Sequence, residues 1–221
     1  MRLPCLLAWL GVLLVCLPLG AEELKVEPLA QGPNPKYVSE AILAQLQPKG
    51  WKLVRQGRSY MAVWLAKGWA TTGKRDASGQ VLYPFAPGQL IGVVRLYRTT
   101  TDFRGQEMRR GYYVLRYGLQ PQDGDHVGTF DTRDFLVLTP AKLDREPASL
   151  ETEKLTELGA ESAGSTHPAI FPLLAPPEQR AEQPQVQRHE EQEWTSVVFP
   201  GKSRNGKPLA LNLIVLGQAE E

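Results

Sequence analysis

WKLVRQGRSYMAVWLA, residues 51–66, contains two runs rich in Val, Leu, Tyr and Trp on either side of a Gly-Arg turn. Such runs, with partial alternation of apolar and polar residues and a turn between them, are typical of paired β-strands. Comparable runs recur at residues 89–98 and 112–117. Residues 135–138, Phe-Leu-Val-Leu, form a short apolar run of the kind found in central strands. This part of the chain therefore predicts an antiparallel sheet.

The C-terminal part of the chain adds a further predicted hairpin. Residues 194–199 and 209–216 are apolar runs, and Asn205-Gly206 between them is a strong tight-turn dipeptide. The chain as a whole has about eight short predicted strands, few helices and no βαβ alternation. These features predict a mainly β fold, an antiparallel sandwich or barrel. Of the two we expect a β-sandwich, jelly-roll or immunoglobulin-like, with one or two peripheral helices.

Two segments carry helix signals. Asn34 followed by Pro35 is a typical N-cap and first helical position, and Pro48 ends the apolar periodicity that follows. Ser149 is the expected N-cap of a second helix, and Gly164 is its expected end. We expect both helices to lie on the outside of the sheet.

Residues 1–21 have the order of a secretory signal peptide. A basic end precedes an almost wholly apolar run at residues 3–17, and small residues precede Glu22. The apolar run is shorter than the roughly 20 residues that span a bilayer. We therefore expect an exported protein, periplasmic or extracellular, that is cleaved after Gly20 or Ala21. No transmembrane segment is expected in the mature chain.

Both cysteines, Cys5 and Cys16, lie inside this segment. The expected mature chain is therefore free of cysteine and has neither disulfides nor thiolate metal ligands. Cys16 also has the outline of a lipoprotein box, but Val15 before it is larger than the residues that such boxes use, so we disfavour lipidation. Freedom from cysteine in an exported domain favours a bacterial envelope protein.

Residues 22–50 are expected to form an extended leader and a short helix, and residues 51–221 a single β-sandwich domain. Within that domain, residues 176–193 are rich in Gln, Glu and Pro and nearly lack large apolar side chains. Such a segment buries too little to order itself, so we expect a low-complexity loop. The 221 residues carry a net charge of +1, which gives no overall field to attract nucleic acid.

The loop at residues 123–134 is the main candidate for chemistry. Asp123, Asp125 and His126 offer oxygen and imidazole ligands of the kind that hold a divalent cation. His167 is a further ligand if the fold brings it to this loop. The spacing is not that of an EF-hand, and Asp-Gly sequences are also ordinary turn chemistry. A structural turn, a divalent-metal site and a metal-dependent hydrolase all stay open.

Aromatic side chains provide a second candidate site. If Met61, Val63 and Leu65 face the core, strand alternation places Tyr60 and Trp64 on the opposite face. Flat aromatic rings on an open sheet face are how many carbohydrate-binding modules stack on sugar rings. The same two rings also suit packing beneath a helix, so both interpretations stay open.

YVLRYGLQPQDGDH, residues 113–126, is followed by RDFL at residues 133–136 and GSTHPA at residues 164–169. Together these segments resemble a set of secreted proteins from environmental bacteria to which no activity is assigned. The resemblance covers about residues 85–175. It implies an exported bacterial protein without disulfides, and it implies no catalytic residue.

Enzyme signatures are missing from the sequence. It has no Gly-x-Ser-x-Gly elbow, no His-Glu-x-x-His, no phosphate-binding glycine loop and no dinucleotide fingerprint. We therefore expect a non-catalytic binding or structural module of the bacterial envelope, without a cofactor unless a divalent metal binds, and with an envelope protein or a glycan as partner. The alternatives are a divalent-metal-binding protein or metal-dependent hydrolase, and a carbohydrate-binding module.

Overall fold

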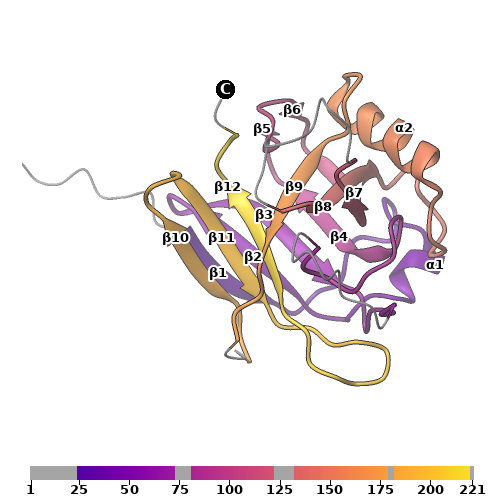
Figure 1. The fold of residues 1–221 in the computed structure, drawn as a ribbon, viewed down its shortest axis with the longest axis horizontal. Helices are drawn as coiled ribbons and strands as arrows, with labels where there is room; N and C mark the ends of the chain where they lie inside the picture. The colour runs from indigo at the N-terminus through magenta and orange to yellow at the C-terminus, as the bar shows by residue number, and fades with distance from the viewer. Residues whose placement is uncertain (1–23, 73–80, 122–131, 179–181, 220–221) are drawn as a thin grey trace, which may run out of the picture.

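The computed structural model describes residues 24–72, 81–121, 132–178 and 182–219, and it consists mainly of antiparallel strands (Figure 1). One ten-stranded sheet has the order β1-β2-β3-β4-β7-β8-β9-β12-β11-β10, and β5 and β6 form a separate hairpin. The strands are β1 (Leu24–Leu29), β2 (Gly50–Arg55), β3 (Arg58–Leu65), β4 (Leu90–Leu96), β5 (Thr100–Thr101), β6 (Glu107–Met108), β7 (Gly111–Leu119), β8 (Asp134–Pro140), β9 (Ile170–Leu174), β10 (Gln185–His189), β11 (Trp194–Phe199) and β12 (Leu211–Leu216). The helices are α1 (Glu40–Leu43) and α2 (Thr152–Ala163). The predicted mainly β, antiparallel fold with peripheral helices is confirmed.

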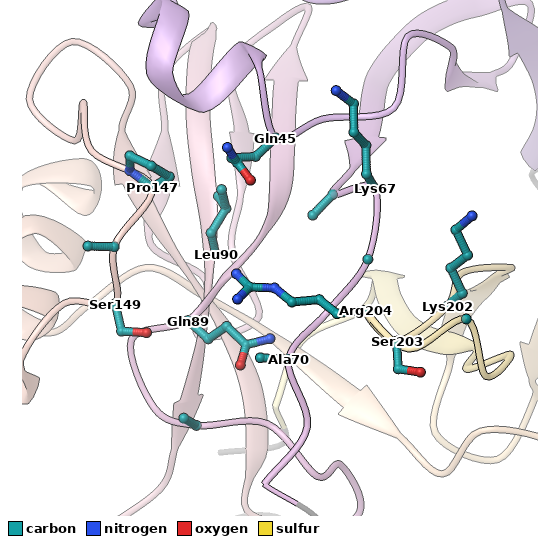
Figure 2. Close-up of a pocket in the computed structure, with 15 residues that line it drawn as sticks. Gln45, Lys67, Ala70, Gln89, Leu90, Pro147, Ser149, Lys202, Ser203 and Arg204 are labelled. Carbon is teal, nitrogen blue, oxygen red and sulfur yellow. The ribbon is translucent and has the colours of Figure 1, made fainter.

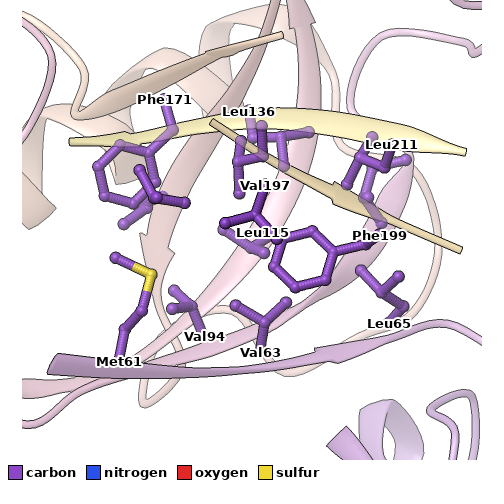
Figure 3. Close-up of a cluster of buried hydrophobic side chains, with 14 of the residues drawn as sticks. Met61, Val63, Leu65, Val94, Leu115, Leu136, Phe171, Val197, Phe199 and Leu211 are labelled. Atoms are coloured by element: carbon purple, nitrogen blue, oxygen red, sulfur yellow. The ribbon is translucent and has the colours of Figure 1, made fainter. Parts of the chain in front are cut away.

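The sheet folds over on itself, so that its two halves enclose the core. Met61 and Val63 project from β3, and Val197 and Phe199 project toward them from β11 (Figure 3). All four side chains are fully buried. The two edge strands, β1 and β10, approach each other, which nearly closes the sheet into a barrel-like shape. The two layers expected of a sandwich are therefore halves of one continuous sheet.

Strand β9 joins the two halves. It pairs with β8 on one side and with β12 on the other. Its sequence contains Pro172, which has no N–H to donate to a strand ladder, and a proline argues against an interior strand. No strand was predicted at residues 170–174, and Pro172 weakens the strand pattern there. The predicted hairpin that follows it is confirmed, because β11 and β12 pair directly across the turn at Asn205-Gly206.

Two segments that were expected to lie outside the sheet are its edge strands. β1 occupies the expected leader and pairs with β2. β10 lies within the expected low-complexity loop and pairs with β11. An edge strand is held by backbone hydrogen bonds to one neighbour, and both edge strands leave most of their side chains partly or fully exposed. Hydrophobic patterning therefore does not reveal them.

Helix α1 is shorter than predicted because its N-cap is a different residue. The Ser39 hydroxyl accepts a hydrogen bond from Ile42 N at 3.3 Å and caps the helix. The predicted cap, Asn34, instead accepts from Lys36 N at 2.9 Å through its side chain and closes a turn. The proline after Asn34 therefore begins that turn and not the helix.

Helix α2 begins after Glu151 and not after the predicted Ser149. The chain at this point is held to the start of β4, because Leu150 N donates to Gly88 O at 3.2 Å. The predicted end is confirmed, since Gly164 is the left-handed C-cap with a φ of 60°. Neither helix in the described part of the chain is long and apolar enough to cross a membrane.

Candidate anion-binding site

A polar cavity of about 660 Å³ opens where β3 ends, β4 begins and β11 turns back toward β12 (Figure 2). The segment before α2 forms its remaining wall. We call this cavity the basic pocket. It is lined by Gln45, Ala66, Lys67, Gly68, Ala70, Ala86, Gln89, Leu90, Pro147, Ala148, Ser149, Lys202, Ser203, Arg204 and Gly206.

Three basic side chains give the pocket its charge, and no aspartate or glutamate is among the described residues that line it. Arg204 extends across the pocket toward Gln89, whereas Lys67 and Lys202 belong to the lining but point away from Gln89 (Figure 2). The Lys67 ammonium donates to the carbonyl oxygen of Ala44 at 2.7 Å, which positions it without neutralising it. Within the residues that the structure describes, none of the three basic groups has an ion-pair partner. The described lining of the pocket therefore has an uncompensated positive charge.

Gln89 contributes a buried donor without a partner. Its side chain is 7% exposed, and its Nε2 has no hydrogen-bond partner among the described residues. The backbone on both sides is fixed, since Gln89 N donates to Ala86 O at 3.1 Å and Gln89 O accepts from Tyr117 N at 2.9 Å. A buried, unsatisfied polar group destabilises a fold by about 1–3 kcal/mol. This amide is therefore a donor positioned for an acceptor that the described part of the chain does not supply.

The basic loop between β11 and β12 is positioned by Trp69. The Trp69 side chain is 1% exposed, and its indole N–H donates to Ile91 O at 3.0 Å. Its backbone N–H donates to Lys202 O at 3.0 Å, and its carbonyl accepts from Arg204 N at 2.8 Å. A Cβ at Gly201 would lie 2.3 Å from the Trp69 ring, so only glycine fits there. The two basic residues of the loop that line the pocket, Lys202 and Arg204, are thus attached to a buried anchor.

The opposite wall is held by a buried ion pair. Arg116 and Asp144 are almost completely buried and form two parallel hydrogen bonds, Nε to Oδ2 at 2.9 Å and Nη2 to Oδ1 at 2.7 Å. Arg116 also donates to the carbonyl oxygens of Gly88, Glu146 and Ala148. These contacts satisfy all five donors of the guanidinium group. Because Ala148 lines the pocket, the ion pair fixes the position of this wall.

The chemistry of the basic pocket is that of an oxyanion receptor. Its side chains supply ammonium, guanidinium, amide and hydroxyl donors, and the described residues of its lining include no imidazole, thiol or carboxyl group. Charge-assisted hydrogen bonds from Arg and Lys to carboxylate, phosphate or sulfate oxygens are among the strongest in proteins. The arrangement therefore suits binding of an anionic group.

The predicted metal site falls largely outside the described residues. Asp123, Asp125 and His126 lie in the segment that the structure does not describe, so their part in a metal site stays a prediction. His167 is exposed in the loop after α2, where its backbone N–H donates to Ser165 Oγ at 3.3 Å. Among the described residues, no group of three or more His, Cys, Asp or Glu side chains is arranged to hold a metal ion.

Asp134, at the end of the predicted acidic loop, is buried and belongs to the core. Its carboxylate accepts from Leu82 N at 2.8 Å, from Tyr83 N at 3.0 Å and from the Tyr117 hydroxyl at 2.6 Å. Burial raises the pKa of Asp134, because desolvation outweighs these hydrogen bonds, and burial also raises the pKa of Tyr117. This carboxylate is therefore bound within the fold and is not open to a ligand.

Tyr60 and Trp64 do not form the predicted sugar-stacking platform. Tyr60 is 4% exposed and donates its hydroxyl to Val215 O at 3.1 Å. Trp64 is 2% exposed, packs in the smaller cluster that includes Ile42 of α1, and donates its indole N–H to Gln31 O at 2.8 Å. Neither ring has a face open to a sugar, and the two rings do not share a face of β3. Tyr60 packs in the main core with Met61, because the register shift between β2 and β3 breaks the alternation there, whereas Trp64 packs beneath α1.

The basic pocket was not predicted from the sequence. Lys67, Gln89 and Arg204 come from three distant segments, and no motif or spacing connects them. One signal was present: Gln89 directly precedes a strongly apolar strand, where a polar side chain is unexpected.

Comparisons of the chain with protein family models, with curated proteins and with solved structures find no match.

Proposed function

We propose that this chain is a non-catalytic binding protein that holds an anionic ligand in the basic pocket. The observation that carries the proposal is that Arg204 extends toward a buried, unpartnered Gln89 amide in a lining that also includes Lys67 and Lys202 (Figure 2). A cavity of about 660 Å³ lies within the usual range of small-molecule sites, roughly 300–1,000 Å³. The ligand is therefore a small oxyanion or the carboxylate, phosphate or sulfate group of a larger molecule.

We further propose that the protein acts in the bacterial envelope. The support is the order of residues 1–21, with a basic end, an apolar run and small residues before Glu22. Intact-mass measurement of protein recovered from a bacterial periplasm tests this part. A mass that lacks residues 1–20 or 1–21 is expected, and a full-length mass in the cytoplasmic fraction would contradict export.

The binding proposal is tested by calorimetric titration with inorganic phosphate and, separately, with citrate. Arg204→Gln removes one charged donor from the pocket, and hydrogen bonds to charged groups contribute about 1.5–3 kcal/mol. We expect the variant to weaken binding by roughly 10- to 100-fold. Lys207→Gln is the matched control, because Lys207 is exposed in the same loop and does not line the pocket.

The control should leave the affinity nearly unchanged. An equal loss in both variants would show that binding depends only on overall charge. An absence of saturable binding to both anions would contradict the proposed function. Near-identical melting temperatures of the two variants establish that neither effect comes from unfolding.

A further inference from the structure

A second cavity, of about 600 Å³, lies between the first turns of α2 and the outer face of β7, β8 and β9. We call it the α2 cleft. Unlike the basic pocket, it is lined mainly by apolar side chains, among them Leu119, Phe135, Val137, Leu155 and Ile170. Figure 1 shows α2 lying along this side of the sheet. The described linings of the cleft and of the basic pocket share no residue.

The position of the cleft follows from how α2 packs. At Gly159 the helix lies so close to the sheet that a Cβ would come within 2.6 Å of both Val137 Cγ1 and Pro168 Cβ. Thr152 and Thr156, nearer the start of the helix, line the cleft together with the residue between them on the same face, Leu155. The cleft therefore lies beside the first turns of α2, ahead of the contact that fixes the helix to β8.

Three basic side chains also line the cleft: Arg104, Arg133 and His167. Among the described lining residues the one acidic side chain, Asp134, uses its carboxylate oxygens for three hydrogen bonds within the fold. Arg133 is held in place by the bond from its Nε to Gln120 O at 3.0 Å. Among the described lining residues, basic side chains therefore outnumber acidic ones. Such an apolar lining is complementary to a molecule that has an apolar body and an anionic head.

We propose that the α2 cleft binds an anionic amphiphile, a monomeric fatty-acid-like molecule with one apolar chain and a terminal carboxylate. The apolar chain lies along Leu155, Val137 and Ile170, and the carboxylate lies at Arg104 and Arg133. This site is separate from the basic pocket, so it stands whether or not the basic pocket binds a free anion. His167, which the sequence suggested as a metal ligand, contributes here to the polar part of the lining.

Calorimetric titration with three probes tests the proposal: decanoate, decanol and acetate. Decanoate has both chain and charge, decanol has the chain alone, and acetate has the charge alone. The titrations use Arg204→Gln, in which anion binding to the basic pocket is weakened. In this variant we expect one saturable site for decanoate, at least tenfold weaker binding of decanol and no measurable binding of acetate. Equal affinity for decanoate and decanol, or no saturable site for decanoate, would overturn the proposal.

Variants locate the site. The double variant Arg104→Gln/Arg133→Gln should weaken decanoate binding by tenfold or more and leave decanol binding unchanged. The double variant Arg109→Gln/Arg110→Gln removes the same charge from two exposed residues outside the cleft and should change neither. Equal loss in both double variants would overturn the assigned head-group position.

Two further variants distinguish binding in the α2 cleft from binding elsewhere on the protein. Thr156→Phe places an aromatic ring on the cleft wall at an exposed helix position and should weaken both decanoate and decanol. Unchanged binding in Thr156→Phe would show that the apolar chain of the ligand lies elsewhere. Arg204→Gln should leave decanoate affinity unaltered, and a loss there would assign decanoate to the basic pocket instead.

Discussion

Two arginines, one behind a wall of the basic pocket and one in its lining, differ in how completely the fold satisfies them. Arg116 is fully buried, pairs with Asp144 through two hydrogen bonds and donates to three carbonyl oxygens. Arg204 is exposed, and its guanidinium group has no ion-pair partner among the described residues. The first arginine builds the wall of the pocket, and the second faces the space that the wall encloses.

The contrast between the two arginines separates polar groups that maintain the fold from polar groups that await a ligand. Buried polar atoms in native structures are nearly always hydrogen-bonded, so an unpaired one points to a partner from outside the chain. Arg116 is completely paired, whereas Gln89, which is buried in the pocket lining and faces Arg204 (Figure 2), leaves its amide nitrogen without a partner among the described residues. The same pocket therefore contains a satisfied network and an unsatisfied one. Four substitutions test this distinction between satisfied and unsatisfied polar groups.

The largest effect is expected from Arg116→Met. It leaves Asp144 buried without its partner, and removal of one member of a buried ion pair destabilises a protein by about 3–5 kcal/mol. Urea unfolding of the variant measures the loss. Arg116→Met combined with Asp144→Leu should recover part of it, because no buried charge is then left unpaired. If the double variant loses as much stability as Arg116→Met and Asp144→Leu lose in sum, the two side chains do not interact, and the pairing is wrong.

Gly88→Ala should have the next largest effect. Gly88 has a φ of +77°, and a Cβ there would lie 1.9 Å from Leu150 O. Backbone strain accounts for about 1–2 kcal/mol, and displacement of the Leu150 segment adds to it. Gly206→Ala is the matched control, since Gly206 also has a positive φ, +83°, but open space around it. Equal losses in the free energy of unfolding would show that the contact with Leu150 has no effect.

Asp134→Asn tests the other buried carboxylate through pH. Burial raises the pKa of Asp134 in the folded state above an unfolded value of about 3.9. Its contribution to the free energy of unfolding is therefore fully present below about pH 3.9 and is lost as pH rises through the raised pKa. The loss is about 1.4 kcal/mol for each pH unit that separates the folded pKa from the unfolded pKa. The free energy of unfolding of the wild type minus that of the variant should fall with pH across this window. If this difference stays constant or rises with pH, the pKa of Asp134 is not raised in the folded state.

The smallest effect on stability is expected from Gln89→Leu, and its sign is opposite. Replacing an unsatisfied amide with an apolar side chain of similar size should leave the free energy of unfolding unchanged or raise it by up to about 1 kcal/mol. The same substitution should weaken phosphate or citrate binding by roughly tenfold. Chemical denaturation and calorimetry on the same sample check both. A loss of stability comparable to that of Arg116→Met would mean that Gln89 is a structural residue.

Much of the fold follows from local sequence. The strands β3, β4 and β7 have apolar runs with turns between them, and the dipeptide Asn205-Gly206 marks the β11–β12 hairpin. The strands that were missed lack such signals: β1 and β10 pair on one side only and expose most side chains, and β9 contains Pro172. Their place in the sheet depends on neighbouring strands, which local patterning does not describe.

The candidate site was not predictable in the same way. Its basic side chains come from the turn after β3 and from the β11–β12 loop, and these meet only because Trp69 lies buried between them. Acidic residues and histidines drew the prediction to residues 123–134, because they form a recognisable cluster along the chain. The pocket is instead assembled by tertiary contacts, and its clearest indicator is an unpaired atom, which is visible only once the chain is folded.

NMR can follow directly whether the unpaired Gln89 donor and the basic side chains of the pocket receive an anion. The side-chain NH2 signals of Gln89 are assigned by their loss in Gln89→Leu and followed during titration with inorganic phosphate and then citrate. We predict a saturable shift of these signals with at least one anion, with the dissociation constant that calorimetry gives, and its loss in Arg204→Gln. Gln89 signals that stay unmoved while an anion binds would contradict the claim.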